Sequence, residues 1–271
     1  MPELPEVETT LRGIRPHLLG QTVASLVVRE ARLRWPIPGN LPEQLQGQPI
    51  GTLERRGKYL LIGVGQGTLI LHLGMSGSLR VTEASIPPRK HDHYDLILPG
   101  GTCLRFHDPR RFGCLLWTEA DPAQHPLIAV LGPEPLGDGF TVAHLHARSR
   151  GRTAAVKSFI MDSHVVVGVG NIYASESLFR AGIAPQRAAG EISRAGYGRL
   201  VDAIRAVLLA SIEQGGTTLR DFVNESGHPG YFKQTLNVYD RAGKPCRVCG
   251  TPIKPGRLGQ RSTFWCPRCQ R

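Results

Sequence analysis

Apolar side chains recur at helical spacing near the start of the chain. In "LPEVETTLRGIRPHLLG" they fall three or four positions apart and so share one helix face. The residues are Val7, Leu11, Ile14 and Leu18. Pro5 suits a first helical turn and Gly20 can end the helix. The pattern predicts an amphipathic helix with one face on a core.

From Thr22 to about Thr118 the hydrophobic pattern changes to short runs of β-branched and apolar residues. Glycine and proline turns separate these runs, as expected for a β-sandwich or barrel. The predicted strands are "TVASLVV", "KYLLIGV", "TLILHL", "GSLRVT", "YDLIL", "TCLRF" and "GCLLWT". Two of them contain an isolated cysteine each, Cys103 and Cys114, which we interpret as small buried thiols.

After a breaker-rich segment, "GPEPLGDG" at 132–139, the pattern becomes helical. The predicted helices are "TVAHLHARS", "AAVKSFIMD", "NIYASESLFRAG" and "SRAGYGRLVDAIRAVLLASIEQ". The stretch "GGTTLRDFVNESGHPGYF" has the composition of a loop. The chain shows no internal repeat and no low-complexity tract.

Four of the six cysteines form two pairs near the C-terminal end. They are Cys246 and Cys249 in "CRVC" and Cys266 and Cys269 in "CPRC", with sixteen residues between the pairs. Each CxxC supplies two thiolates from one tight turn, and two such turns close a tetrahedral shell around Zn²⁺. Disulfides are the alternative, but nothing in the sequence indicates secretion. We therefore predict one structural zinc ion in a β-hairpin.

These patterns together predict an α+β protein of two domains. A β-sandwich with a leading helix would span 2–131, followed by a hinge linker at 132–139. A helical domain would span 140–236, and the zinc hairpin 237–271.

The net charge indicates the partner. Lys and Arg outnumber Asp and Glu by 33 to 22, which gives a formal charge of +11. A balance this basic favours a polyanion, either nucleic acid or an acidic membrane. No apolar run is long enough to span a bilayer, and the acidic N-terminus does not read as a signal peptide. We expect a cytoplasmic protein, a monomer, that binds nucleic acid.

The first residues, "MPELPEV", also carry possible chemistry. Removal of Met1 would leave Pro2 as a free secondary amine, and such an amine attacks a sugar C1′ to give a cationic iminium directly. A helix N-terminus and nearby cations would lower its pKa. Glu3 would stand beside it as a proton donor or acceptor. The alternative is an ordinary acidic first helical turn, because Pro and Glu are both favoured there.

The order of several blocks decides between these alternatives. The N-terminal "MPELPEVETTLRG" is followed by "RRGKYLLI", "LHLGMSGSLR", "KHDHYDLIL", "HDPRRFG", "LGPEPL", "GVGNIYASESLF", "SIEQGGTTLRDF" and "PCRVCG…QRSTFWCPRCQ". In sequence and order these blocks, which cover nearly the whole chain, resemble bacterial formamidopyrimidine-DNA glycosylase. The resemblance implies a base-excision repair enzyme that flips oxidised purines out of duplex DNA, removes them and cuts the abasic strand by β,δ-elimination.

By the same resemblance, Pro2 is the nucleophile and Glu3 its acid–base partner, with Glu6 supporting the pocket. Lys58 would donate a proton in β-elimination. Arg261, between the cysteine pairs, would hold phosphates around the lesion and assist δ-elimination. Without the resemblance, Lys58 would be interpreted as an ordinary surface lysine between two strands.

The resemblance also implies a set of DNA contacts. Met75 and Phe112 would fill the space left by the flipped base, and Arg110 would face the orphaned partner base. The glycine-rich "VGVGNIYASESLF" resembles a helix–two-turn–helix element, in which Asn171 would bind a phosphate. The remaining implied contacts are His72, His91, Arg152 and Lys157. The predicted base-recognition loop is Thr217, Thr218, Leu219, Arg220, Asp221 and Phe222.

Two alternatives stay open from the sequence. One is an endonuclease VIII-like glycosylase for oxidised pyrimidines, whose N-terminus typically reads Pro-Glu-Gly-Pro rather than Pro-Glu-Leu-Pro. The other is a zinc-containing DNA-binding protein without catalysis, against which only "PELPE" and Lys58 argue.

Overall fold

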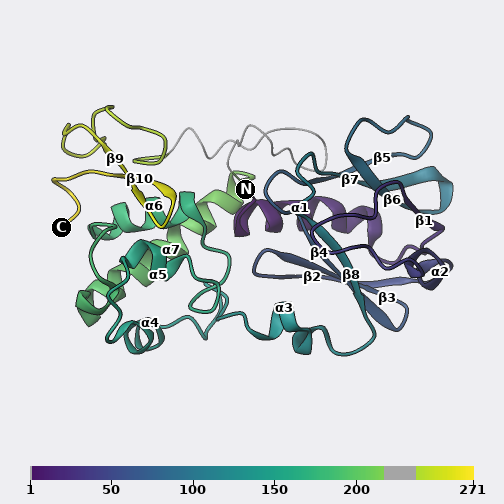
Figure 1. Cartoon of the computed structure of the whole chain (residues 1–271), viewed down its shortest axis with the longest axis horizontal. Helices are drawn as coiled ribbons and strands as arrows, with labels where there is room; N and C mark the ends of the chain where they lie inside the picture. Colours follow the sequence, from purple (N-terminus) through teal and green to yellow (C-terminus); the bar gives the residue numbers. More distant parts are fainter. Residues whose placement is uncertain (1, 217–235) are drawn as a thin grey trace. The chain divides into compact units, whose positions relative to one another are not determined.

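The computed structural model describes residues 2–216 and 236–271 and divides into two compact units. The first unit comprises 1–129 together with 214–231, and the second comprises 130–213 together with 232–271. Strands dominate the first unit, and helices and a short hairpin form the second (Figure 1). The predicted α+β class is confirmed.

The leading helix is α1 (Leu4–Leu18), as predicted. Its apolar face is buried and packs against the β-sheets of the first unit. The N-terminus of α1 has its own cap, because Glu3 and Glu6 exchange hydrogen bonds with each other's backbone N–H groups. This reciprocal capping fixes the direction in which the chain enters the helix.

Two four-stranded antiparallel sheets make the sandwich, in the orders β1-β6-β7-β5 and β2-β3-β4-β8. The strands of the first sheet are β1 (Ser25–Val28), β5 (Ser78–Glu83), β6 (Asp92–Ile97) and β7 (Thr102–His107). Those of the second are β2 (Ile50–Arg56), β3 (Tyr59–Val64), β4 (Gly67–His72) and β8 (Cys114–Thr118). Short helical turns connect them: α2 (Leu41–Leu45), η1 (Pro99–Gly101), η2 (Pro122–Gln124) and α3 (Pro126–Ala129).

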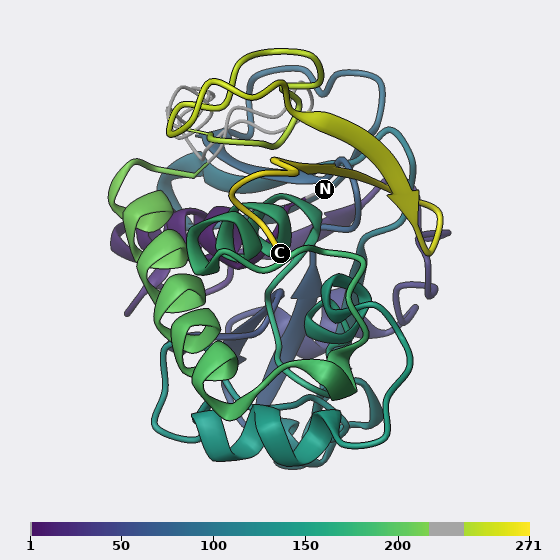
Figure 2. The ribbon, with the colours of Figure 1, turned by 90° about the vertical axis from the view of Figure 1, so that its left-hand side faces the viewer.

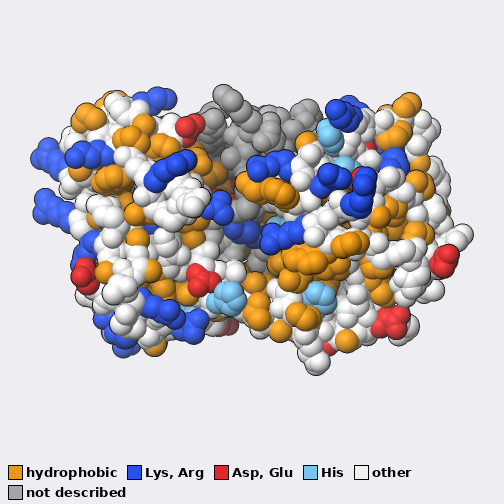
Figure 3. All heavy atoms as spheres, viewed as in Figure 1, with side chains coloured by type: hydrophobic (Ala, Val, Ile, Leu, Met, Phe, Trp, Pro, Cys, Tyr) orange, Lys and Arg blue, Asp and Glu red, His pale blue; other side chains and the backbone are white. Residues whose placement is uncertain are grey.

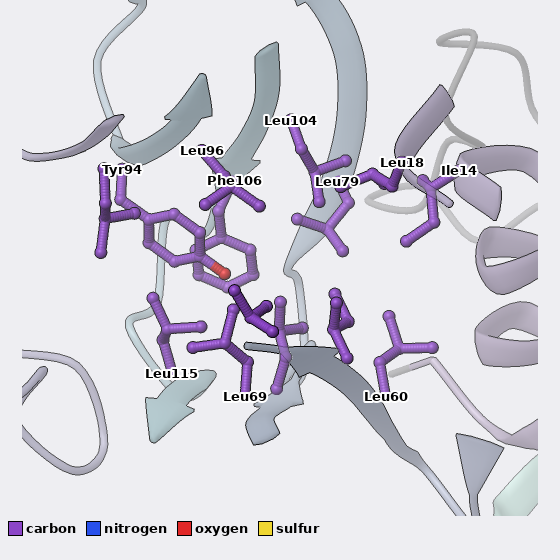
Figure 4. Close-up of a cluster of buried hydrophobic side chains, with 14 of the residues drawn as sticks. Ile14, Leu18, Leu60, Leu69, Leu79, Tyr94, Leu96, Leu104, Phe106 and Leu115 are labelled. Atoms are coloured by element: carbon purple, nitrogen blue, oxygen red, sulfur yellow. The ribbon is translucent and has the colours of Figure 1, made fainter. Parts of the chain in front are cut away.

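The core of this unit lies between the two sheets, where apolar side chains from both meet (Figure 4). Tyr94 and Phe106 stack there with ring centroids 4.9 Å apart, and Ile14 of α1 closes one end of the same cluster. Cys103 and Cys114 are both fully buried, as predicted. Burial of this many apolar side chains makes the sandwich a rigid support for the turns at its edges.

One strand was missed by the sequence reading. β2 contains Glu54, Arg55 and Arg56, and this charged run breaks the alternation by which strands are recognised. The strand forms because Ile50 and Leu53 are buried and because β3 pairs with it antiparallel, with one irregularity between Ile50 and Thr52. Pairing across the sheet outweighs local polarity here.

The described part of the second unit contains four α-helices, in the places where they were predicted (Figure 2). They are α4 (Val142–Ser149), α5 (Val156–Ile160), α6 (Asn171–Ala181) and α7 (Arg194–Glu213), with a short turn η3 (Ala189–Glu191). The Tyr173 hydroxyl and Ser211 Oγ, 2.6 Å apart, join α6 to α7 in the buried interior. Among the described helices, none has the length and apolar character that crossing a membrane requires.

A two-stranded hairpin, β9 (Lys254–Leu258) and β10 (Arg261–Trp265), completes the second unit. The segment that leads into it is fixed by one carboxylate of α6. Glu176, 3% exposed, accepts the backbone N–H groups of Asn237, Val238 and Tyr239 at 2.8–2.9 Å. A buried charge with this many donors is well compensated.

Candidate functional site

The predicted nucleophile and its partner lie at the start of α1. Pro2 is buried, and Glu3 and Glu6 are 2% and 0% exposed. The Glu3 carboxylate accepts the backbone N–H of Glu6, and Glu6 Oε2 accepts the backbone N–H of Glu3 at 2.9 Å. Two carboxylates are therefore held within the first helical turn, which follows Pro2 directly in the chain.

A glycine from the other end of the chain approaches the same turn. Gly216 has φ +84°, and a Cβ added there would stand 3.3 Å from Glu6 Oε1. The predicted recognition loop follows directly, but its residues lie outside the described part of the chain. They are Thr217, Thr218, Leu219, Arg220, Asp221 and Phe222.

The turn that carries Lys58 joins β2 to β3 and is tied to α1 by an arginine. Arg55 donates to Glu8 Oε2 at 2.9 Å and to the Gly57 carbonyl at 3.1 Å. Burial raises the pKa of Glu8, but hydrogen bonds from Arg55 and Arg12 outweigh this and hold it below its usual range. Glu8 is thus an anion that links the lysine turn to the helix of Glu3.

His72, at the end of β4, is a neutral ring with a defined tautomer. Burial, together with the charges of Lys58 and Arg34, lowers the pKa of His72 to about 4. Its Nδ1 accepts the backbone N–H of Gly74 at 2.9 Å, so the ring proton must be on Nε2. His72 and Lys58 therefore lie close together, with an N–H donor on each.

Two neighbouring turns carry the predicted intercalating residues. Turn 73–77 holds Met75, which is partly buried, and turn 108–113 holds Arg110 and Phe112. The Phe112 ring is 41% exposed, unusual for a large apolar side chain, and the Arg110 guanidinium lies 4.9 Å from its centroid. An exposed apolar tip beside a cation suits contact with stacked bases.

A cationic groove of about 500 Å³ adjoins turn 108–113. It is lined by Arg32, Leu33, Arg34, Arg110, Arg111 and Phe112. The Arg34 backbone N–H donates to the Gly113 carbonyl at 3.1 Å, which joins the two walls. Figure 3 shows many Lys and Arg side chains and few Asp and Glu side chains on the visible face. The sequence reading did not single out Arg32 or Arg34.

His91 precedes β6 with a left-handed backbone, φ +74°. Its ring lies 6.3 Å from that of His93 and 6.1 Å from that of His107. Slight burial and the positive charges of its neighbours, Lys90 first among them, lower the pKa of His91. It is therefore a partly exposed ring at the edge of the sheet whose charged form its basic neighbours disfavour.

In the second unit, Asn171 is the first residue of α6, and its Oδ1 atom is buried without a hydrogen bond among the described residues. Arg152 is exposed, as a DNA contact requires. Lys157 is 1% exposed, and its Nζ donates to the Ser262 carbonyl at 2.9 Å and to Thr263 Oγ1 at 2.8 Å. These two hydrogen bonds tie α5 to β10.

Arg261 begins β10, directly after the hairpin turn, and is exposed. Together with Lys157, Leu258 and Gly259 it lines a shallow pocket of about 260 Å³. Lys157 of α5 is hydrogen-bonded to Ser262 and Thr263, the two residues that follow Arg261. Helix α5 therefore helps to fix the position of Arg261.

The four paired cysteines fit one tetrahedral metal ion. Their Sγ atoms all lie within 4.8 Å of one another, with Cys246 to Cys269 at 3.9 Å and Cys249 to Cys266 at 3.5 Å. Zn–S bonds of about 2.3 Å give tetrahedral edges of about 3.8 Å. The backbone N–H groups of Val248 and Cys269 donate to Sγ atoms at 3.4 Å, as around metal-bound thiolates. The cluster is a site for one structural zinc ion, as predicted.

A basic surface, a helical unit and a four-cysteine finger define the class of zinc-finger proteins that bind nucleic acid. Three family models match the chain: the formamidopyrimidine-DNA glycosylase N-terminal domain at 1–115, the H2TH domain of the same glycosylase at 131–223, and the zinc finger found in FPG and IleRS at 243–271. The chain belongs to the formamidopyrimidine-DNA glycosylase family, as the sequence resemblance implied.

Full-length relatives agree. The chain is 67% identical to the formamidopyrimidine-DNA glycosylase of Methylococcus capsulatus and 60% identical to that of Pseudomonas putida, in each case over all of both chains. The crystal structure of the MutM (Fpg) protein of Thermus thermophilus is 39% identical, with a TM-score of 0.89 over 99% of this chain and 98% of that one. A Lactococcus lactis Fpg complex with abasic-site DNA is 30% identical, with a TM-score of 0.92 over 99% of each chain.

Proposed function

We propose that this protein is a base-excision repair enzyme that removes oxidised purines from duplex DNA and then cleaves the abasic strand. Full-length similarity to formamidopyrimidine-DNA glycosylases supports the glycosylase activity. Solved relatives bound to DNA containing Fapy-dG or an abasic site support the substrate. The lyase activity rests on the chemistry of the N-terminal residues.

The observation that carries this proposal is Pro2 immediately before two buried carboxylates at a helix N-terminus. After removal of Met1, the Pro2 nitrogen attacks C1′ of the flipped nucleotide. The glycosidic bond breaks, and the departing base takes its electron pair and a proton. Opening of the sugar ring leaves a cationic iminium between C1′ and the proline nitrogen. Glu3 is the group placed to exchange protons with the sugar.

The iminium then draws electrons from the neighbouring carbons. Loss of a C2′ proton expels the 3′ phosphate, and a second elimination expels the 5′ phosphate. Lys58, with a positive charge close to His72, supplies a proton during the first step. Arg261 binds phosphates around the lesion and assists the second. The zinc ion has four thiolate ligands and no open position, so its part is to order the hairpin.

The remaining assigned residues bind the DNA. His72 Nε2 donates to a phosphate, and Asn171 does the same at the N-terminus of α6. His91, Arg152 and Lys157 add contacts to the sugar–phosphate backbone of the DNA. Met75, Arg110 and Phe112 fill the space left by the flipped base, and the loop 217–222 closes on that base.

We extend the proposal to the organisation of the chain. The boundaries are a sandwich domain at 2–131, a hinge at 132–139, a helical domain at 140–236 and a zinc hairpin at 237–271. The protein would act as a monomer in the cytoplasm, on the double-stranded DNA of the nucleoid.

Borohydride trapping tests the central step. Incubation with a duplex containing an oxidised purine, in the presence of borohydride, should give a covalent complex whose peptide map places the crosslink on Pro2. Glu3→Gln should keep DNA binding and lose trapping. A crosslink on Lys58 with Pro2 unmodified would contradict the assignment. A duplex panel of oxidised purines and pyrimidines, run alongside, distinguishes the endonuclease VIII-like specificity.

A further inference from the structure

Asp108 is a wholly buried carboxylate that no step of the proposed reaction uses. Its Oδ1 accepts the Ser76 hydroxyl at 2.8 Å and the Arg110 backbone N–H at 3.2 Å. Its Oδ2 accepts the Gly113 backbone N–H at 2.8 Å. One carboxylate therefore joins turn 73–77 to both ends of turn 108–113.

The backbone of Asp108 makes further connections to the neighbouring strands. Its N–H donates to the His91 carbonyl at 3.0 Å. Its carbonyl lies 2.6 Å from His93 Nε2 and accepts the Arg111 N–H at 3.2 Å. The residue is thus fixed to the β6–β7 edge of one sheet, at the place where both turns cross from one sheet to the other.

The two turns also touch through their backbones. A Cβ added at Gly74, which has φ +68°, would stand 2.5 Å from the Gly113 nitrogen and from the Phe112 carbonyl carbon. A Cβ added at Gly113 would stand 2.7 Å from the His72 carbonyl oxygen. Contacts this close leave no room for one turn to slide past the other.

We propose that Asp108 is a positioning residue that makes Met75, Arg110 and Phe112 a single preformed wedge. The inference rests on the proposed function, since it assumes that these three side chains enter the duplex together. Unstacking a base step costs a few kcal/mol, so a wedge ordered only on binding would add its own ordering cost to this. Asp108 removes that cost without touching DNA.

Asp108→Asn is the sharpest test, because it preserves shape and changes the donor pattern. In either amide orientation an N–H₂ group faces a backbone N–H, that of Gly113 or that of Arg110. The turns should then separate. Ser76→Ala removes only one of the three donors to the carboxylate and should have a smaller effect in the same direction.

The readout is the ratio of two single-turnover rates: excision of a formamidopyrimidine lesion opposite cytosine, and cleavage of a preformed abasic site. We expect Asp108→Asn to lower excision about tenfold more than abasic-site cleavage, since an abasic site has no base to displace. With 2-aminopurine beside the lesion, its fluorescence at saturating protein should rise less than with the wild-type protein.

Asp95→Asn is the matched control. Asp95 is an equally buried carboxylate of the same unit, paired with Arg29 and Arg105 and not with the turns. It should lower stability and leave the ratio unchanged. An unchanged ratio and fluorescence signal in Asp108→Asn would overturn the inference. If the wild-type protein excised no lesion, the proposed function itself would fail, which is a separate outcome.

Discussion

The ring of His72 is held as a neutral donor by burial and by the N–H of Gly74. A buried histidine whose pKa falls to about 4 resists protonation in the folded state. The unfolded chain, with a histidine pKa of about 6.5, takes up the proton more readily. Folding therefore loses stability as pH falls from about 6.5 toward 4.

We predict that His72→Gln reduces this acid sensitivity. Glutamine can still accept the Gly74 N–H but cannot be protonated, so the loss of unfolding free energy between pH 7.5 and 5 should be smaller than in the wild-type protein. Urea denaturation at the two pH values measures it. His17→Gln, at an exposed ring of α1, is the control. Parallel loss in His72→Gln and wild type would show that His72 does not contribute.

The hydrogen bonds of Lys157 should contribute to the stability of the folded protein. Replacing it with methionine keeps the stem but leaves Thr263 Oγ1 and the Ser262 carbonyl without this donor, at a cost of about 1–3 kcal/mol. Thermal unfolding should show the loss, whereas Lys254→Met, at an exposed position of β9, should change little. Undiminished stability in Lys157→Met would show that these two hydrogen bonds do not stabilise the fold.

At the scale of elements, α1 and the β2–β3 turn are joined by Arg55. We predict that Arg55→Lys slows strand cleavage about tenfold while Pro2 trapping persists, because lysine cannot bridge Glu8 and the Gly57 carbonyl together and Lys58 moves. Quench-flow assays of abasic-site cleavage and borohydride trapping would separate the two steps.

Arg12→Ala is the control for this bridge. Arg12 also pairs with Glu8, but from the next turn of α1 and not from the β2–β3 turn, and its side chain is 63% exposed. It should leave both steps near wild type. Equal slowing in the two variants would mean that the charge of Glu8, and not the bridge to the turn, matters.

The sequence predicted some of these elements and missed others. Apolar periodicity predicted α1, the sandwich strands and the helices of the second unit, because each buries a continuous face. Strand β2 was not predicted, because it is stabilised by pairing with β3 and its own residues do not alternate between apolar and polar. CxxC spacing predicted the zinc ligands, but the hydrogen bonds of Asp108, Arg55 and Lys157 join positions far apart in the chain, which no local pattern contains.

At the scale of the whole molecule, the zinc hairpin should contribute to DNA affinity through Arg261. Zn²⁺ bound by four thiolates contributes on the order of 10 kcal/mol to a hairpin too short to bury a core of its own. We predict that Cys249→Ser and Arg261→Ala both bind DNA more weakly. Each lost phosphate contact should make the slope of log affinity against log salt shallower by about 0.9.

Salt titrations with metal analysis of both variants measure this effect. Zinc content should fall only in Cys249→Ser, and the first unit should stay folded in both, because its core contains none of these residues. A zinc-free Cys249→Ser protein with unchanged affinity and salt slope would show that the hairpin does not bind DNA.

The zinc hairpin is attached to α6 through the backbone of the segment that leads into it. Glu176 holds residues 237–239 mainly through their main-chain N–H groups, so this anchor recognises a backbone shape that proline could not supply. The side chains are constrained separately, because Val238 is fully buried and the Tyr239 ring packs against Phe264 of β10. The finger is therefore attached through its main chain and fitted through its side chains, and a family model described for both FPG and IleRS is in keeping with a unit that more than one host can carry.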